Sequence, residues 1–178
     1  LLALSAIFHS HAMAQVDTDK TIVAASAHIA DDKDLTAAEL IALTQQTNRA
    51  FHASILSGFE AGKAQTPQQA LIALYSAFRL GDPESAALYL DLRYVPESIE
   101  DISPTALAKG LLFIFAQQNV LDLNQISSEP EGTLEDGLPE DLEKAGAVTL
   151  SQEVIPVYLQ RIEDPDGTLA WRVANETL

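Results

Sequence analysis

The pattern that most restricts the fold of this chain lies near its carboxyl end, in EVIPVYLQRIEDPDGTLAWRV. Apolar and more polar residues alternate on both sides of Asp164-Pro165-Asp166-Gly167, which is typical of strands with one buried face. The four central residues carry Asp, Pro and Gly where a type I turn favours them. We therefore predict an antiparallel hairpin, whose inward-facing residues are Ile155, Val157, Leu159, Leu169, Trp171 and Val173.

One proline restricts where the first of these strands can lie. Pro156 has no backbone N–H to donate, so we expect its strand to lie at a sheet edge or to break at this residue. Two further stretches, VLDLN (residues 120–124) and GAVTL (residues 146–150), are weaker strand candidates. Together these segments predict a small antiparallel sheet in the second half of the chain.

Two of the helices predicted before the sheet have clear starts. Thr36 and Glu39 form a capping box, in which each side chain bonds a backbone N–H at the helix start, and this helix is expected to run to about Ala61. Another helix is expected to open at Ser103-Pro104 and to end near Asn119. Its apolar face consists of Leu107, Leu111, Ile114 and Phe115.

The helix between these two has the most regular pattern. Thr66 is the predicted cap, Pro67 fits the first turn, and Gln69 is expected to complete a second capping box. Gly81 is a typical helix stop, and Asp82-Pro83 begins a short helix directly after it. The apolar face is predicted to hold Leu71, Leu74, Tyr75 and Phe78, at helical spacing.

Helices followed by antiparallel strands predict an α+β fold. In it, amino-terminal helices pack on a small antiparallel sheet that ends in a hairpin. A nuclear-transport-factor-2-like arrangement is one form that such a fold takes, and we keep it as a further expectation.

The charge of the chain excludes two classes of partner. Asp and Glu number 26 against 10 Lys and Arg, and the formal net charge is -16. Such a surface repels phosphate backbones and anionic lipid headgroups, so we predict that this chain binds neither nucleic acid nor lipid directly. Cysteine is absent, which removes disulfides and thiolate metal sites.

The acidic charge is concentrated in SSEPEGTLEDGLPEDLEK, residues 127–144, which contains seven carboxylates. The carboxylates do not follow the spacing of an EF-hand calcium loop, and we predict no bound metal. Gly132 and Gly137 are suited to turns. We therefore expect a solvated loop that connects helix to sheet.

Candidate catalytic groups are few. His52 has no second histidine at helical spacing, and the chain contains neither a nucleophile elbow nor a phosphate-binding glycine motif. Tyr75, Phe78, Tyr89 and Trp171 are expected in the core, with a ligand pocket as the alternative. Asp91 beside aromatic residues is one candidate general base. We predict no enzyme activity and no cofactor.

The amino-terminal residues are typical of export. An apolar run ends at Phe8, and Ala12-Met13-Ala14 fits the small-residue cleavage rule. We expect residues 1–14 to be part of a signal peptide, residues 15–35 a loose arm, residues 36–62 a helix of uncertain role, and residues 63–178 the α+β domain. This organisation predicts export from the cytoplasm, and the family resemblance of the later segments implies a location on the periplasmic side of the bacterial inner membrane.

Three segments, residues 66–92, 121–148 and 154–178, resemble in order the extracytoplasmic amino-terminal domain of small-conductance mechanosensitive channels. The resemblance covers about the last two thirds of the chain. The residues that carry it are Thr66, Pro67, Gly81, Asp82, Leu90, Asp91, Leu92, Pro130, Glu131, Gly132, Asp136, Gly137, Leu138, Pro139 and Trp171; we refer to them below as the signature residues.

The resemblance implies a non-catalytic regulatory or assembly domain of an ion channel that responds to membrane tension. Its partners would be the membrane-embedded part of the same polypeptide, expected beyond residue 178, and identical subunits in a ring. The alternative is a stand-alone periplasmic ligand-binding module of the nuclear-transport-factor-2-like type. A less favoured reading makes such a module an isomerase or hydratase with Asp91 as the base.

Overall fold

The computed structural model describes residues 35–118 and 122–178. The described chain begins with a long helix, α2 (Ala37–Ser57), followed by α3 (Pro67–Leu80), the short α4 (Pro83–Ala87) and α5 (Pro104–Gln118). A 3-10 turn, η1 (Leu123–Gln125), leads into the acidic segment, and a second, η2 (Asn175–Thr177), ends the chain. The expected signal peptide and most of the expected arm lie outside the described residues.

Three antiparallel strands follow the helices in the order β1-β2-β3: β1 (Leu142–Leu150), β2 (Glu153–Glu163) and β3 (Leu169–Val173). The β2–β3 hairpin is the one predicted, and its turn is closed by a bond from the Gly167 N–H to the Asp164 carbonyl oxygen at 2.8 Å. A parallel bridge between Leu90 and Val173 joins the segment after α4 to the free edge of β3. The α+β class is therefore confirmed, and the nuclear-transport-factor-2-like form stays a prediction.

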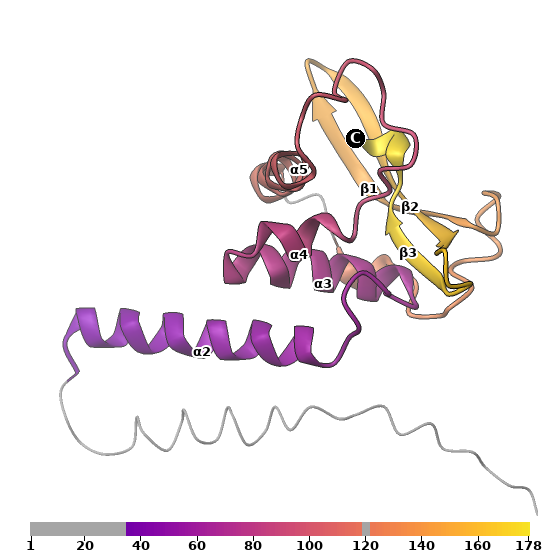
Figure 1. The fold of residues 1–178 in the computed structure, drawn as a ribbon. Helices are drawn as coiled ribbons and strands as arrows, with labels where there is room; N and C mark the ends of the chain where they lie inside the picture. The colour runs from indigo at the N-terminus through magenta and orange to yellow at the C-terminus, as the bar shows by residue number, and fades with distance from the viewer. Residues whose placement is uncertain (1–34, 119–121) are drawn as a thin grey trace, which may run out of the picture.

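The core lies where α3, α4 and α5 meet the sheet, with these helices on one side of it (Figure 1). Its largest fully buried side chains include Trp171, Tyr89, Leu71, Leu74 and Leu159. By contrast, α2 contacts α3 and buries none of its own residues completely. The first turns of α2 project beyond the rest of the described chain (Figure 1). No helix within the described ranges is long and apolar enough to cross a membrane.

The helix starts follow the predicted capping rules, with two corrections. The full capping box at Thr36 is present, but α2 ends at Ser57, one turn earlier than expected, with Gly58 as its cap. Thr66 accepts from the Gln69 N–H at 3.1 Å, but the Gln69 side chain accepts from the Gln65 N–H and does not complete a second box. Gly81 has left-handed backbone angles, φ 76 and ψ 29, and ends α3 as predicted.

The predicted apolar face of α3 is only half right. Leu71 and Leu74 are buried, but 41% of Tyr75 and 37% of Phe78 remain exposed. Small side chains make up much of the rest of the buried face. Because they are small, α3 can approach the core closely. The buried residues of α3 are Pro67, Ala70, Leu71, Ala73, Leu74, Ser76 and Ala77. On α5, Leu111 and Phe115 are buried as predicted, and the expected helix end at Asn119 lies outside the described residues.

Two strand predictions need correction and one is confirmed. Residues 146–150 belong to a strand, β1, as predicted. The candidate strand at residues 120–124 is not formed by its described part, because Leu123–Gln125 is a 3-10 turn. Residues 120 and 121 lie outside the described residues. Pro156 lies in the central strand, not at the sheet edge. It is tolerated because β3 pairs only with residues 159–163 of β2, so that at Pro156 the strand has a neighbour on one side alone.

Candidate functional site

The acidic segment is not wholly solvated: its first turn is fastened to the sheet. The Pro130 carbonyl oxygen accepts two hydrogen bonds, from Trp171 Nε1 at 2.9 Å and from Arg161 Nη1 at 3.1 Å. Arg161 also lies over the Trp171 ring, with its guanidinium carbon 5.7 Å from the ring centroid. These two residues are cross-strand neighbours on β2 and β3, so the hairpin presents them side by side.

A buried carboxylate holds the second half of the same turn. Glu143 on β1 is 2% exposed and accepts from the backbone N–H of Thr133 at 2.7 Å, from the Thr133 hydroxyl at 3.0 Å and from the Ser127 N–H at 3.1 Å. A buried carboxylate requires such donors, because an unpaired charge away from water is strongly destabilising. We call Glu143, Arg161 and Trp171 the loop anchor.

Gly132 closes the loop over the anchor. The residue is buried, has a φ of 76°, and a Cβ built on it would lie 3.1 Å from two ring carbons of Trp171 and 3.1 Å from Glu143 Oε2. Only glycine combines this backbone conformation with so close an approach. The expected turn at Gly132 is therefore present, but it is packed against the core side of the sheet.

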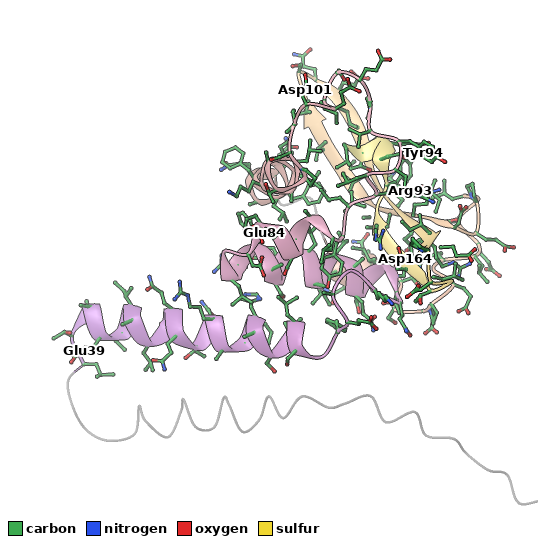
Figure 2. All side chains as sticks on the ribbon, in the orientation of Figure 1. Glu39, Glu84, Arg93, Tyr94, Asp101 and Asp164 are labelled. Carbon is green, nitrogen blue, oxygen red and sulfur yellow. The ribbon has the colours of Figure 1, made fainter. Side chains whose placement is uncertain are left out.

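A second cluster lies along the edge of β3 that faces away from β2. Asp91 is 1% exposed, and its two carboxylate oxygens accept from Arg93 Nε at 2.8 Å and Arg93 Nη2 at 2.9 Å. The Asp91 N–H donates to the Val173 carbonyl oxygen at 2.8 Å. Arg172, the neighbour of Val173, bonds Asp164 at 2.6 Å. Figure 2 labels Arg93 and Asp164 where the helical layer meets β3.

The environment of Asp91 fits an ion pair better than a general base. Burial alone raises the pKa of Asp91, but the hydrogen bonds from Arg93 and the charges of Arg93 and Arg172 outweigh it and hold the pKa below its usual value. Both oxygens are already engaged by one guanidinium, and a lowered pKa makes a carboxylate a weaker base. The geometry gives Asp91 a structural role.

The signature residues divide into four groups in the structure. Leu90, Asp91, Pro130, Gly132 and Trp171 meet along β3. Leu92 packs at the edge of the core. Thr66, Pro67, Gly81 and Asp82 are helix caps and first-turn residues of α3 and α4. The remaining signature residues line the outer part of the acidic loop and are exposed or half-buried: Glu131, Asp136, Gly137, Leu138 and Pro139.

Several residues that matter to these clusters were not among the predicted ones. Glu143 and Arg161 complete the loop anchor, and Arg93 and Arg172 neutralise Asp91 and Asp164. The sequence holds one usable signal, since Arg161 precedes the predicted turn at the position that faces Trp171 across the hairpin. Within the described ranges, no group of three or more His, Asp or Glu side chains is arranged to hold a metal ion.

Comparisons with protein-family models, with curated proteins and with solved structures found no match to this chain.

The Asp91 ion pair predicts a pH-dependent stability that Asp91→Asn removes. Because the pKa of Asp91 is lowered on folding, its contribution is full above the ordinary carboxyl pKa and is lost as the pH falls through the lower, folded value. We expect Asp91→Asn to cost about 2 kcal/mol at neutral pH, since hydrogen bonds to charged groups contribute roughly that much. The difference should shrink as the pH falls below the ordinary carboxyl pKa, as measured by urea unfolding.

The matched control is Glu97→Gln, which removes a carboxylate from an exposed position of the same connecting segment. It should leave the free energy of unfolding within about 0.5 kcal/mol of the parent at each pH. An Asp91→Asn variant whose deficit is equally large in acid and at neutral pH would show that the ion pair is not the source of the stabilisation.

Proposed function

We propose that this chain is a non-catalytic, extracytoplasmic regulatory or assembly domain of a small-conductance mechanosensitive channel. The observation that carries the proposal is the convergence of signature residues from three separate segments. Leu90-Asp91, Pro130–Gly132 and Trp171 are far apart in sequence, but they meet along β3. Residues that share a family pattern for the sake of the fold are expected to gather in this way.

The fold supports a role without chemistry of its own. Both carboxylate oxygens of Asp91, the candidate base, are occupied by Arg93. The backbone of the acidic loop is hydrogen-bonded to the Glu143 carboxylate and to the Trp171 indole N–H. Both clusters fix the loop and the segment after α4 onto the sheet. A rigid, strongly acidic domain of this kind is suited to packing and spacing within an assembly.

In such a channel the domain would act on an equilibrium between closed and open rings. It can shift that equilibrium only by packing with a different free energy in the two states. Membrane tension would act on the membrane-embedded part, and the domain would set the threshold at which the pore opens. The periplasmic location and the homo-oligomeric ring are parts of the same proposal.

The test uses the natural full-length protein in bacterial membranes. Residues 15–178 are deleted while the signal peptide is kept, and the tension threshold is measured in membrane patches alongside the oligomeric state in detergent. We expect the threshold or the stability of the ring to change while conduction persists. An unchanged threshold together with an unchanged ring would contradict the proposal, as would a natural reading frame without a membrane-spanning segment.

A ligand-binding module is the second candidate, and one observation favours it. A pocket with a volume of about 510 Å³ lies between α2 and α3, lined by residues that include Arg49, His52 and Arg79. Its size is in the usual range for small-molecule sites. If the natural reading frame ended at residue 178, this candidate would take precedence.

A further inference from the structure

The pocket between α2 and α3 is positively charged on a protein that is otherwise strongly acidic. Its lining, within the described part of the chain, includes Arg49, Arg79 and His52 and contains no Asp or Glu. The whole chain has 26 acidic residues against 10 basic ones. Two arginines that line one pocket without a carboxylate therefore stand apart from the general charge pattern.

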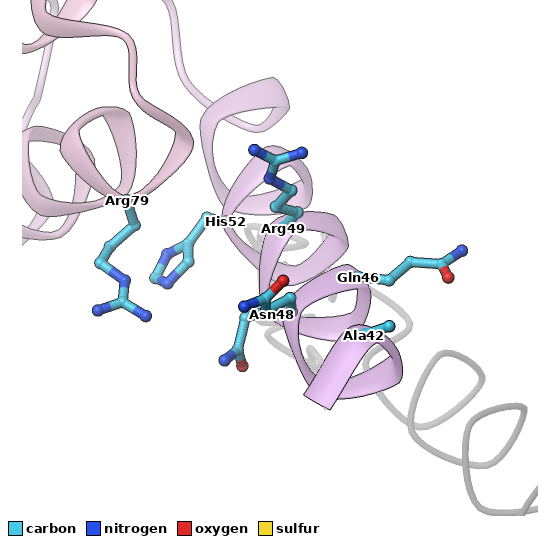
Figure 3. Close-up of a pocket in the computed structure, with 7 residues that line it drawn as sticks. Ala42, Gln46, Asn48, Arg49, His52 and Arg79 are labelled. Atoms are coloured by element: carbon cyan, nitrogen blue, oxygen red, sulfur yellow. The ribbon is translucent and has the colours of Figure 1, made fainter. Parts of the chain in front are cut away.

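Two helices supply these side chains. Asn48, Arg49 and His52 lie within one turn of α2, where residues three and four apart are neighbours on the helix surface. Arg79 comes from the last turn of α3. Figure 3 shows Arg79 alongside α2 with the His52 ring between Arg79 and the helix, and Arg49 on the neighbouring turn with its guanidinium group directed away from Arg79. Six of the seven described lining residues thus come from α2, and α3 contributes Arg79.

The arginines have no acidic partner in the described ranges. The ion pairs found there join Lys63, Arg93 and Arg172 to carboxylates, and none involves Arg49 or Arg79. Arg79 lies over the Tyr75 ring, 5.9 Å from its centroid, which positions its side chain without neutralising the charge. A guanidinium group presents a rigid fork of donors that matches carboxylate and phosphate oxygens.

The pKa of His52 responds to the positive charge of the pocket. Its Nδ1 lies 3.1 Å from the Ser76 hydroxyl, and its ring packs edge-on against Tyr75. Burial lowers the pKa of His52, and the positive charge of Arg79 lowers it further. The imidazole is therefore mainly neutral at neutral pH, and the positive charge of the pocket comes from the arginines.

We propose that the pocket between α2 and α3 binds a small anion through a carboxylate or phosphate group, with Arg49 and Arg79 as the charged donors. Asn48 and His52 supply neutral hydrogen-bonding groups beside them. The volume of about 510 Å³ suits a metabolite-sized ligand better than a folded partner. This inference concerns a ligand that the proposed channel role does not require, so either one can fail without the other.

The binding test titrates the full chain with citrate and, separately, with inorganic phosphate, and follows the His52 imidazole by proton NMR. The His52 resonance is assigned by its loss in His52→Asn. We expect saturable one-to-one binding at millimolar or lower concentration and a rise in the pKa of His52, because a bound anion offsets the field of Arg79. Tighter binding of citrate would identify a carboxylate ligand, and tighter binding of phosphate a phosphate ligand.

Two variants locate the site and a third controls for charge. Arg49→Gln and Arg79→Gln should each weaken binding about tenfold, since each removes a charge-assisted hydrogen bond. Lys109→Gln removes one positive charge from an exposed position on α5 and should leave the affinity unchanged. Circular dichroism verifies that each variant is folded. Absence of saturation with both anions, or equal weakening by Lys109→Gln, would overturn the proposal.

Discussion

Gly132→Ala should destabilise the protein by about 2 kcal/mol, the sum of two separate costs. The left-handed conformation of this residue, with φ 76°, costs any residue with a Cβ about 1 kcal/mol. The new methyl group would also lie 3.1 Å from the Trp171 ring. Crowding of a packed site costs at least about 1 kcal/mol more. The loop cannot retreat easily, because the Pro130 carbonyl and the Thr133 backbone are both hydrogen-bonded to the anchor.

Gly137→Ala provides a matched control in the same loop. Gly137 has nearly the same backbone conformation, φ 80°, but a Cβ there would meet no atom within 4 Å. It should therefore lose only the conformational part, about 1 kcal/mol. Urea unfolding followed by the fluorescence of Trp171, the single tryptophan, measures both variants. Equal losses in the two would show that the contact between Gly132 and Trp171 has no energetic weight.

Features governed by neighbouring residues could be read from the sequence. Thr36, Thr66 and Asp82 cap the helices that they were predicted to cap. The Asp164–Gly167 turn forms where its residue types indicate. Each depends on a hydrogen bond or a backbone preference that spans about four positions, so little tertiary information is needed.

The turn between β1 and β2 shows the limit of such local rules. Ser151 and Gln152 occupy it with φ values of 50° and 74°, a conformation for which Asn-Gly or Gly-Gly is the usual signal. Neither residue type favours positive φ, so the sequence carries no turn signal here. Residues 146–150 were therefore only a weak strand candidate. The pairing with β2 holds the turn in spite of its local preference.

The exposed aromatic residues of α3 could not be placed from helical spacing alone. Periodicity gives equal weight to any large apolar residue, and so it placed Tyr75 and Phe78 in the buried face. In the structure Ala73, Ser76 and Ala77 take that place, because small residues let the helix lie close to its neighbours. Tyr75 instead contacts His52 from α2 and Arg79 from its own helix.

The burial of Glu143 could not be predicted from the sequence for a different reason: β1 contains a β-bulge. The pairing of β1 with β2 shifts by one residue between Lys144 and Gly146, and a one-residue shift exchanges the two faces of a strand. Glu143 thereby faces the same side as Val148, although the two are an odd number of residues apart and both are buried. In sequence Glu143 is the last of seven acidic residues in its segment, six of which are exposed, so composition indicated solvent for all.

Glu143→Ala is the substitution expected to cost most, about 3 kcal/mol. It leaves three donors without an acceptor: the backbone N–H groups of Ser127 and Thr133 and the Thr133 hydroxyl. Each unsatisfied donor costs about 1 kcal/mol or more when it stays buried. Water can reach part of the exposed loop, and for this reason the total stays near the lower bound. Glu143→Gln keeps one acceptor oxygen and should lose less.

Glu140→Ala is the control that distinguishes the loss of the buried carboxylate from the loss of one negative charge in the acidic segment. It removes the same charge from an exposed residue three positions away, and it should change the free energy of unfolding by no more than about 0.5 kcal/mol. Trp171 fluorescence adds a local measurement, because release of the loop frees the indole N–H from Pro130 and admits water to the ring. A stable Glu143→Ala variant with an unchanged emission spectrum would mean that the loop is held without its carboxylate. The turn would then depend on Trp171 and Arg161 alone.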